Sequence, residues 1–181
     1  MTPPSSKHRQ TPGRKIGQGM LIASFSLALL GLTFTFDGWL EKQQNPNQDP
    51  YSSETRTGIR EVALQRNRQG HYVSAGTING IPVTFLLDTG ATAVAIPPSL
   101  ATAAGLVPGY ASRATTANGV ITVYSTQIDK LVFGNIELNN INASITPTMG
   151  NDTILLGMSA LKEVEFSQRG STLTLRQLPE S

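Results

Sequence analysis

The chain has 181 residues, of which 39% are hydrophobic and 14% charged, with 17 Gly and 11 Pro, a composition typical of one turn-rich globular domain with appendages. It contains no Cys, which excludes a disulfide framework, a thiolate nucleophile and a cysteine-based zinc site. The net charge of +2 resides in the amino-terminal part of the chain, because from Arg60 onward eight basic residues balance eight acidic ones. The part from Arg60 onward therefore lacks the excess of positive charge that is typical of a domain that binds nucleic acid.

A basic segment, residues 1–19, precedes an apolar run from Met20 to Phe36 that Trp39 and Leu40 extend. Spanning helices need about 20 such residues, within a range of about 17–25. The four basic residues before the run predict that this end is cytoplasmic. A cleaved signal peptide is the alternative, but its apolar region is usually shorter, about 7–15 residues, and no Ala-x-Ala-like site follows here. We therefore predict a transmembrane anchor over residues 20–40 that contacts the lipid bilayer.

The stretch from Glu41 to Thr57 is rich in Gln, Asn, Pro and Ser and has almost nothing to bury. The sequence therefore predicts a flexible linker over residues 41–58. The globular domain would follow over residues 59–181, on the side of the membrane away from the cytoplasm.

Short apolar or alternating runs separated by Gly, Asn and Pro predict strands and turns from here on. His71–Ile78 leads through Asn79-Gly80 into Ile81–Asp88, and Asn-Gly between two such runs is the strongest short hairpin signal. Pro97-Pro98-Ser99 and the following Leu and Ala residues predict a short helix, with Ser99 as a possible cap and Gly105 as its end.

A second predicted hairpin consists of Tyr110–Ala117 and Val120–Ile128 around Asn118-Gly119, and two further apolar runs lie between Leu131 and Ile145. The last section predicts an apolar strand, a short helix ending at Lys162 and two strands. Strands at this spacing with one or two short helices predict an all-β fold, a compact closed β-barrel preceded by one transmembrane helix.

The candidate for chemistry is Asp88, which follows the apolar residues Phe85-Leu86-Leu87 and precedes Thr89, Gly90 and Ala91. A carboxylate at the end of a buried strand is costly unless it has a partner or a function. Its ordinary structural role would be a turn-forming residue at a strand end. The pattern apolar-apolar-Asp-Thr-Gly-Ala resembles the active-site loop of aspartic proteases, and Ala91 is closer to the retroviral type than to the pepsin type.

Further features carry the same resemblance to the retropepsin-like family. The Asn118-Gly119 hairpin is placed like the flap that closes over substrate, and Ile154-Leu155-Leu156-Gly157 with a short helix after it resembles the pseudo-symmetric counterpart of the Asp loop. The resemblance covers roughly Gly70 to Leu175. It is closest to bacterial single-pass proteins with a periplasmic retropepsin-like domain, which implies an inner-membrane location.

The resemblance implies a peptide hydrolase in which Asp88 activates water, Gly90 permits the tight loop and Thr89 locks two loops together across a dimer. Because the chain has one Asp-Thr-Gly and is too short for a two-lobed enzyme, two chains must meet around a two-fold axis. The expected partners are a second copy and a peptide or protein substrate, and no metal or other cofactor is needed. Ala91 lacks the hydroxyl that pepsin-type relatives place there, so we expect activity nearer neutral pH than a pepsin's.

Two non-enzymatic hypotheses stay open. The first is a peptide-binding or assembly module of the same fold that holds extended peptides by strand addition. The second is a structural envelope protein in which Asp88 is dispensable. His8 and His71, the two histidines, have no carboxylate cluster with metal-ligand spacing near them in sequence and are interpreted as surface residues.

Overall fold

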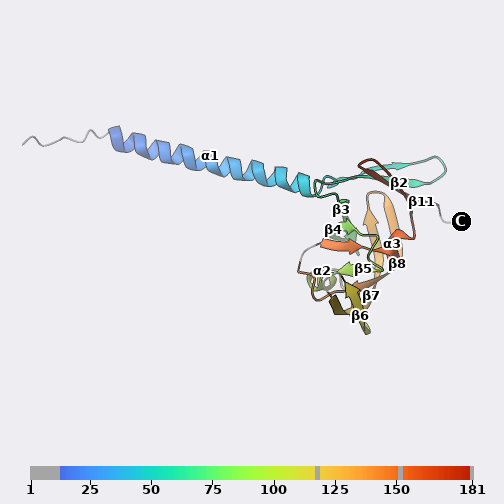
Figure 1. Cartoon of the computed structure of the whole chain (residues 1–181). Coiled ribbons are helices and arrows are strands. Elements are labelled where there is room, and N and C mark those ends of the chain that lie inside the picture. Colours follow the sequence, from blue (N-terminus) through green and yellow to red (C-terminus); the bar gives the residue numbers. More distant parts are fainter. Residues whose placement is uncertain (1–12, 117–118, 151–152, 180–181) are drawn as a thin grey trace, which may run out of the picture. The chain divides into compact units, whose positions relative to one another are not determined.

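The computed structural model describes residues 13–116, 119–150 and 153–179 (Figure 1). The chain divides into two compact units, Met1–Leu40 and Glu41–Ser181. Helix α1, Gly13–Gln44, supplies the described part of the first unit, and its large apolar side chains from Met20 to Leu40 are exposed to solvent. By length and composition, its segment Gly17–Gln44 could cross a membrane or act as a signal sequence.

The second unit is mostly β-sheet, as predicted. Its elements in chain order are β1 Tyr51–Glu54, β2 Arg60–Gln65, β3 Val73–Ile78, β4 Ile81–Leu87, β5 Val94–Ile96, α2 Pro98–Ala103, β6 Ala111–Thr116, β7 Gly119–Phe133, β8 Ile136–Ile145, β9 Thr153–Leu156, α3 Met158–Leu161, β10 Glu165–Arg169 and β11 Thr172–Gln177.

Seven strands form the larger sheet, in the order β3-β4-β9-β5-β8-β7-β6. An additional pairing of β3 with β7, through Thr77↔Val132 and Ile78↔Leu131, closes six of these strands into a barrel. The ring of Phe85 meets that of Phe133 edge to face inside it, with centroids 6.3 Å apart. The barrel is filled by fully buried aliphatic side chains, among them Ile78, Ile128, Leu131, Ile136, Ile154 and Leu156.

The β3–β4 hairpin forms where Asn79-Gly80 predicted it. Both turn residues have positive φ, 48° and 82°, which is the conformation that makes Asn-Gly favourable in a two-residue loop. Strand β4 then runs parallel to β9, with Leu87 opposite Leu156. The end of β4, where the Asp-Thr-Gly tripeptide begins, therefore lies beside the end of β9.

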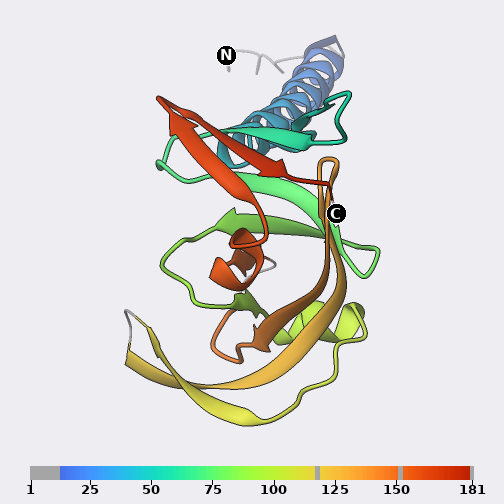
Figure 2. The ribbon, with the colours of Figure 1, turned by 90° about the vertical axis from the view of Figure 1, so that its right-hand side faces the viewer.

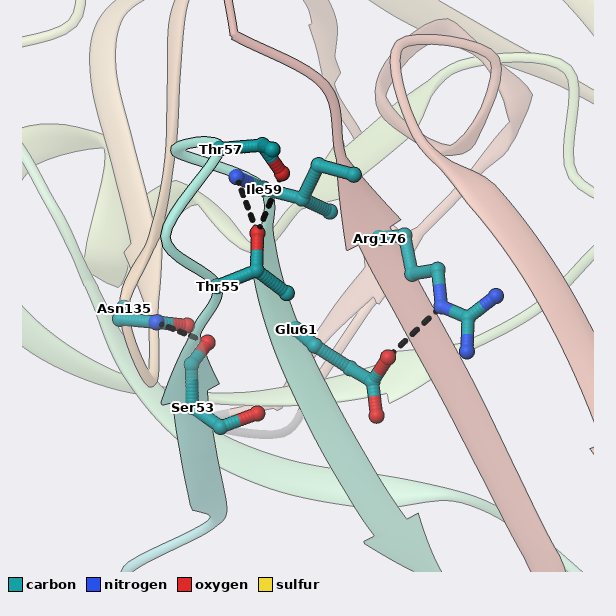
Figure 3. Close-up of polar contacts among 7 residues, drawn as sticks. All are labelled: Ser53, Thr55, Thr57, Ile59, Glu61, Asn135 and Arg176. Carbon is teal, nitrogen blue, oxygen red and sulfur yellow. Dashed lines mark hydrogen bonds and ion pairs between the residues drawn. The ribbon is translucent and has the colours of Figure 1, made fainter.

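The four-stranded sheet has the order β1-β2-β11-β10 and is antiparallel throughout. Val62, Leu64 and Leu175 are fully buried on one of its faces. On β2 and β11 an ion pair joins Glu61 to Arg176 at 2.6 Å (Figure 3). In this sheet the last two strands, β10 and β11, follow the β1–β2 hairpin, with β11 paired to β2.

The segment 41–58, expected to be a flexible linker, is instead a structured part of the second unit. The buried side chain of Asn47 donates hydrogen bonds to the carbonyls of Gln65 (2.9 Å) and Val73 (2.6 Å), and its Oδ1 accepts one from the N–H of Gln65 (2.7 Å). The polar composition that suggested disorder thus supplies hydrogen bonds between the end of β2 and the start of β3. Burial of apolar side chains is not what orders this segment.

Polar contacts also order the turn between β1 and β2. The hydroxyl of Thr55 accepts a hydrogen bond from the N–H of Ile59 at 3.1 Å (Figure 3). The side-chain amide of Asn135, in the β7–β8 turn, donates to the carbonyl of Ser53 at 2.8 Å. The first bond closes the turn, and the second joins the β1–β2 hairpin to the barrel.

Helix α2 corrects one detail of the sequence analysis. Its N-cap residue is Pro97 and no side chain caps it, so Ser99 lies inside the first turn. Pro98, at the first helical position, has a φ already suited to the helix and lacks an N–H, so one fewer donor there needs an acceptor. Gly105 ends the helix as predicted, with φ of 69°, and the N–H of Leu106 donates to the carbonyl of Ala101.

Candidate active site

Asp88 begins the loop between β4 and β5, and its backbone is fixed on both sides. Its N–H donates to the carbonyl of Leu156 at 3.2 Å, and its carbonyl accepts a hydrogen bond from the N–H of Ala91, also at 3.2 Å. Its Oδ1 accepts a hydrogen bond from the N–H of Gly90 at 2.9 Å. The side chain of Asp88 is half-buried, whereas Thr89 and Gly90 are exposed. The loop thus presents one carboxylate at the domain surface in a fixed orientation.

The start of α3 holds the second half of the same loop. The N–H of Met158 donates to the carbonyl of Ala91 at 2.8 Å, and the N–H of Ser159 donates to the carbonyl of Thr92 at 3.0 Å. A Cβ on Gly157 would overlap the carbonyl oxygens of Ala91 and Ala93, so the loop packs directly on the glycine backbone. Two residues that the sequence analysis singled out, Leu156 and Gly157, therefore touch the Asp loop.

Ser159 is a site residue that the sequence analysis missed. Its Oγ accepts a hydrogen bond from the N–H of Val94 at 3.0 Å and donates one to the carbonyl of Asn142 at 2.7 Å. One hydroxyl therefore joins the end of the Asp loop, α3 and β8. The sequence signal was a small polar residue two positions after Gly157, which is too common a feature to identify a site.

A cavity of about 420 Å³ opens beside the Asp loop. Its lining combines Asp88 and Thr89 with mostly apolar side chains from the residue before β3, the end of β4, α3 and the β10–β11 hairpin, namely Tyr72, Leu87, Leu161, Phe166, Gln168, Leu173 and Leu175. The hydroxyl of Tyr72 is buried and finds no hydrogen-bond partner among the described residues. The sequence analysis gave Tyr72, Phe166 and Gln168 no place in the site, because only the tertiary fold brings them to the same cavity as Asp88.

The predicted flap is the β6–β7 hairpin. Gly119 begins β7 with φ of 115°, a conformation that favours glycine, and Asn118 lies outside the described residues. Figure 2 shows this hairpin, the loop between β4 and β5 and the β10–β11 hairpin projecting toward the same side of the domain. The predicted flap therefore lies on the same side of the domain as the loop between β4 and β5.

Among the described residues, no three His, Asp or Glu side chains lie close enough together to hold a metal ion. His71 is exposed and distant in sequence from the Asp loop, and His8 lies outside the described residues. The Asp loop itself offers the carboxylate of Asp88, the hydroxyl of Thr89 and backbone N–H and C=O groups.

Comparisons with known proteins agree with this geometry. Residues 74–163 match the sequence pattern of the family described as "gag-polyprotein putative aspartyl protease", and this range includes Asp88, the β6–β7 hairpin and Gly157. A solved structure of a retropepsin-like aspartic protease from Rickettsia conorii superposes with a TM-score of 0.58 at 26% sequence identity, covering 71% of this chain and 96% of that one.

Two curated relatives are described as uncharacterized proteins. One, from Sinorhizobium sp., is encoded in the cobV 5′ region and is 33% identical over 123 residues, which is 66% of this chain and 53% of the relative. The other, from Rickettsia prowazekii, is 30% identical over 110 residues, which is 59% of this chain and 46% of the relative. The chain thus spans about half the length of the curated relatives it matches.

Proposed function

Because the chain belongs to the retropepsin-like family of aspartic proteases, we propose that it is an aspartic endopeptidase that works as a homodimer anchored in a membrane. Its reaction is peptide-bond hydrolysis by a water molecule activated between two copies of Asp88. The observation that carries this proposal is the Asp loop itself: a half-buried carboxylate at the domain surface, held by backbone hydrogen bonds from β9 and α3.

The second carboxylate comes from a second chain, since this one has a single Asp-Thr-Gly. Two carboxylates brought within a few ångströms share one proton and titrate as a unit, as the catalytic pairs of aspartic proteases do. The ionised Asp88 takes a proton from the attacking water while the protonated copy donates to the oxygen of the scissile carbonyl. The roles then reverse, and the leaving amine receives the proton.

Three neighbours support Asp88 in this mechanism. The N–H of Gly90 donates to Oδ1 of Asp88 and so fixes the carboxylate. Thr89 is exposed next to it, where its hydroxyl can reach the partner's loop. Ala91 connects the loop to α3 through its carbonyl. Gly119, at the start of β7, and Asn118, which lies outside the described residues, are assigned to substrate binding.

The apolar helix supports the anchoring. We assign residues 20–40 to the lipid bilayer, with the basic segment in the cytoplasm and the catalytic domain on the periplasmic side of the inner membrane. Confining two weakly associating chains to one membrane raises their effective concentration. The anchor would then favour the active dimer as well as set its location.

The test is cleavage of an unbiased peptide mixture by the full chain in detergent micelles, comparing the wild type with Asp88→Asn at several pH values. We expect cleavage by the wild type and none by the variant, which keeps the size of the side chain but cannot act as the base. If neither protein cleaves any peptide although a dimer is confirmed, the enzymatic proposal is overturned and the peptide-binding module is favoured.

A further inference from the structure

The connection between β2 and β3 is hydrogen-bonded to the last turn of α1. That turn, Glu41–Gln44, belongs to the second unit. The side-chain amide of Asn67 donates to the carbonyl of Gln44 at 3.0 Å, and Nη1 of Arg68 donates to Oε1 of Gln43 at 2.8 Å. The domain thus binds the carboxyl end of the apolar helix through two side chains of one loop.

Asn67 also fixes the loop that carries Arg68. Its buried side chain accepts hydrogen bonds at Oδ1 from the N–H of Gln69 (3.0 Å) and the N–H of His71 (2.9 Å). Its backbone N–H donates to the carbonyl of His71 at 2.8 Å, and its carbonyl accepts from the N–H of Gly70 at 3.1 Å. The loop is therefore closed around one buried amide, while the side chains of Arg68 and His71 are exposed.

Two more arginines lie at this end of the four-stranded sheet. The N–H of Arg66, the residue after β2, donates to the carbonyl of Ser171 in the β10–β11 turn at 2.9 Å. Arg169 ends β10 and pairs across that turn with Thr172, which pairs in turn with Gln65 of β2. Both arginines are exposed. We define the basic end of the sheet as the exposed cations Lys42, Arg66, Arg68 and Arg169.

The basic end carries an excess of positive charge. The ion pairs among the described residues lie elsewhere in the domain and join Lys130 to Glu137, Lys162 to Glu163 and Arg176 to Glu61. Two carboxylates are close to the basic end along the chain, Glu41 and Asp49, so four cations against two carboxylates leave a charge of +2. The opposite end of the sheet is balanced, with Glu54, Arg56, Arg60, Glu61, Glu165 and Arg176.

The side chains of the basic end suit a phosphate group. A guanidinium binds phosphate oxygens through two parallel N–H bonds, and arginine has five such N–H donors. Arg68 uses Nη1 for Gln43 and keeps its remaining donors for a ligand. Because Gln43 holds one edge of this guanidinium, part of the cost of ordering the side chain on binding is already met.

The position of the basic end along the chain indicates where the phosphate comes from. Lys42 follows Trp39 by three residues, and the ring of Trp39 lies 5.6 Å from that of Phe36, between centroids, at the end of the apolar run. Aromatic side chains of this kind gather at the membrane–water interface. Clustered Lys and Arg residues next to a spanning helix attract anionic lipids.

We propose that the basic end of the sheet binds anionic phospholipid headgroups of the membrane in which α1 is anchored, with Arg66 and Arg68 as the main phosphate ligands. The domain then has a second attachment to the bilayer besides its helix, and the lipid charge compensates the cations. This inference rests on the part of the proposed function that assigns residues 20–40 to the bilayer. It does not depend on Asp88.

The experiment reconstitutes the full chain into mixed vesicles of phosphatidylcholine and phosphatidylglycerol. Trp39 is the one tryptophan of the chain, and lipids with brominated acyl chains quench its fluorescence. Brominating one lipid or the other in otherwise identical vesicles gives the relative binding of the two lipids beside Trp39. The basic residues before Met20 precede the apolar run, whose length of roughly 30 Å separates them from this probe.

We expect the wild type to prefer phosphatidylglycerol roughly fivefold or more, because each Lys or Arg at a charged membrane surface adds up to about fivefold to binding. Arg66→Gln/Arg68→Gln should abolish most of that preference. Arg66→Lys/Arg68→Lys keeps the charge and should retain most of it. The matched control Arg56→Gln/Arg60→Gln removes the same charge at the opposite end of the sheet and should leave the preference unchanged.

Equal quenching of the wild type by the two brominated lipids would overturn the proposal. A preference that survives in Arg66→Gln/Arg68→Gln would also overturn it, as would equal losses in both glutamine variants, because net charge alone would then explain the effect. Quenching by neither lipid would reject the anchoring of residues 20–40 and this inference with it. Peptide cleavage that Asp88→Asn abolishes is measured separately, so the proposed enzyme can stand when the lipid site fails.

Discussion

The backbone of Gly157 packs directly against the carbonyl oxygen of Ala93, with no room for a Cβ between them. The carbonyl oxygen of Ala91 lies only 2.7 Å from the position that this Cβ would take. Both oxygens belong to the Asp loop and both are backbone atoms, so neither can move away without moving the loop. Glycine at position 157 is therefore a condition for the position of Asp88.

We predict that Gly157→Ala lowers both stability and peptide cleavage. Overpacking of this kind costs roughly 1–3 kcal/mol of unfolding free energy, and the displaced loop would misalign the two carboxylates. Thermal unfolding followed by circular dichroism measures the first effect and cleavage the second. Gly150→Ala is the matched control, because a Cβ there meets no atom within 4 Å. A Gly157→Ala protein with wild-type cleavage would contradict this account of the loop.

Ser159→Ala is predicted to reduce turnover because it removes the hydroxyl that positions the Asp loop. The buried N–H of Val94 loses its acceptor, at a cost of about 1–3 kcal/mol. We expect kcat to fall severalfold with KM nearly unchanged, since Ser159 contacts the loop and lies outside the cavity lining. Ser159→Thr keeps the hydroxyl and should recover most of kcat. Equal losses of kcat in the two variants would show that the hydroxyl of Ser159 does not account for the effect.

Much of the fold could be predicted from local patterns. The positive φ values of Asn79 and Gly80 follow from the preference of Asn-Gly for a tight hairpin, and the barrel strands follow from short apolar runs. Asp88 and Gly157 could be identified because each belongs to a motif that is contiguous in sequence. Ser159 and Tyr72 could not, since their importance depends on which strands become neighbours.

The linker shows a different limit of the sequence analysis. A polar stretch without apolar residues indicates disorder when stability is attributed to burial alone. The side chain of Asn47 instead makes three hydrogen bonds to backbone groups of Gln65, in β2, and Val73, in β3. These two residues lie at the two ends of the connection between the two sheets. Composition does not reveal that one amide in such a stretch has backbone partners far along the chain.

Asn47→Ala is predicted to destabilise the second unit substantially. It would leave the N–H and carbonyl of Gln65 and the carbonyl of Val73 without that partner. A fully buried group left unpaired costs roughly 1–3 kcal/mol, and these part-buried groups cost less than that each. Thermal or urea unfolding of the full chain measures the loss. Gln48→Ala, at the exposed neighbouring position, should change stability by no more than about 0.5 kcal/mol. Similar midpoints for the two variants would disprove a structural role for Asn47.

The same contacts predict where the chain can be shortened. A fragment beginning at Glu41 keeps Asn47 and strand β1, whereas one beginning at Gly58 loses both and exposes the edge of β2. We therefore expect the first fragment to unfold cooperatively near the midpoint of the full chain's β-sheet signal, and the second to unfold at a clearly lower temperature or to aggregate. Circular dichroism melts and light scattering of the two fragments make the comparison. Equal stability of both would mean that residues 41–57 are a tether after all, and that cutting there could release an intact domain.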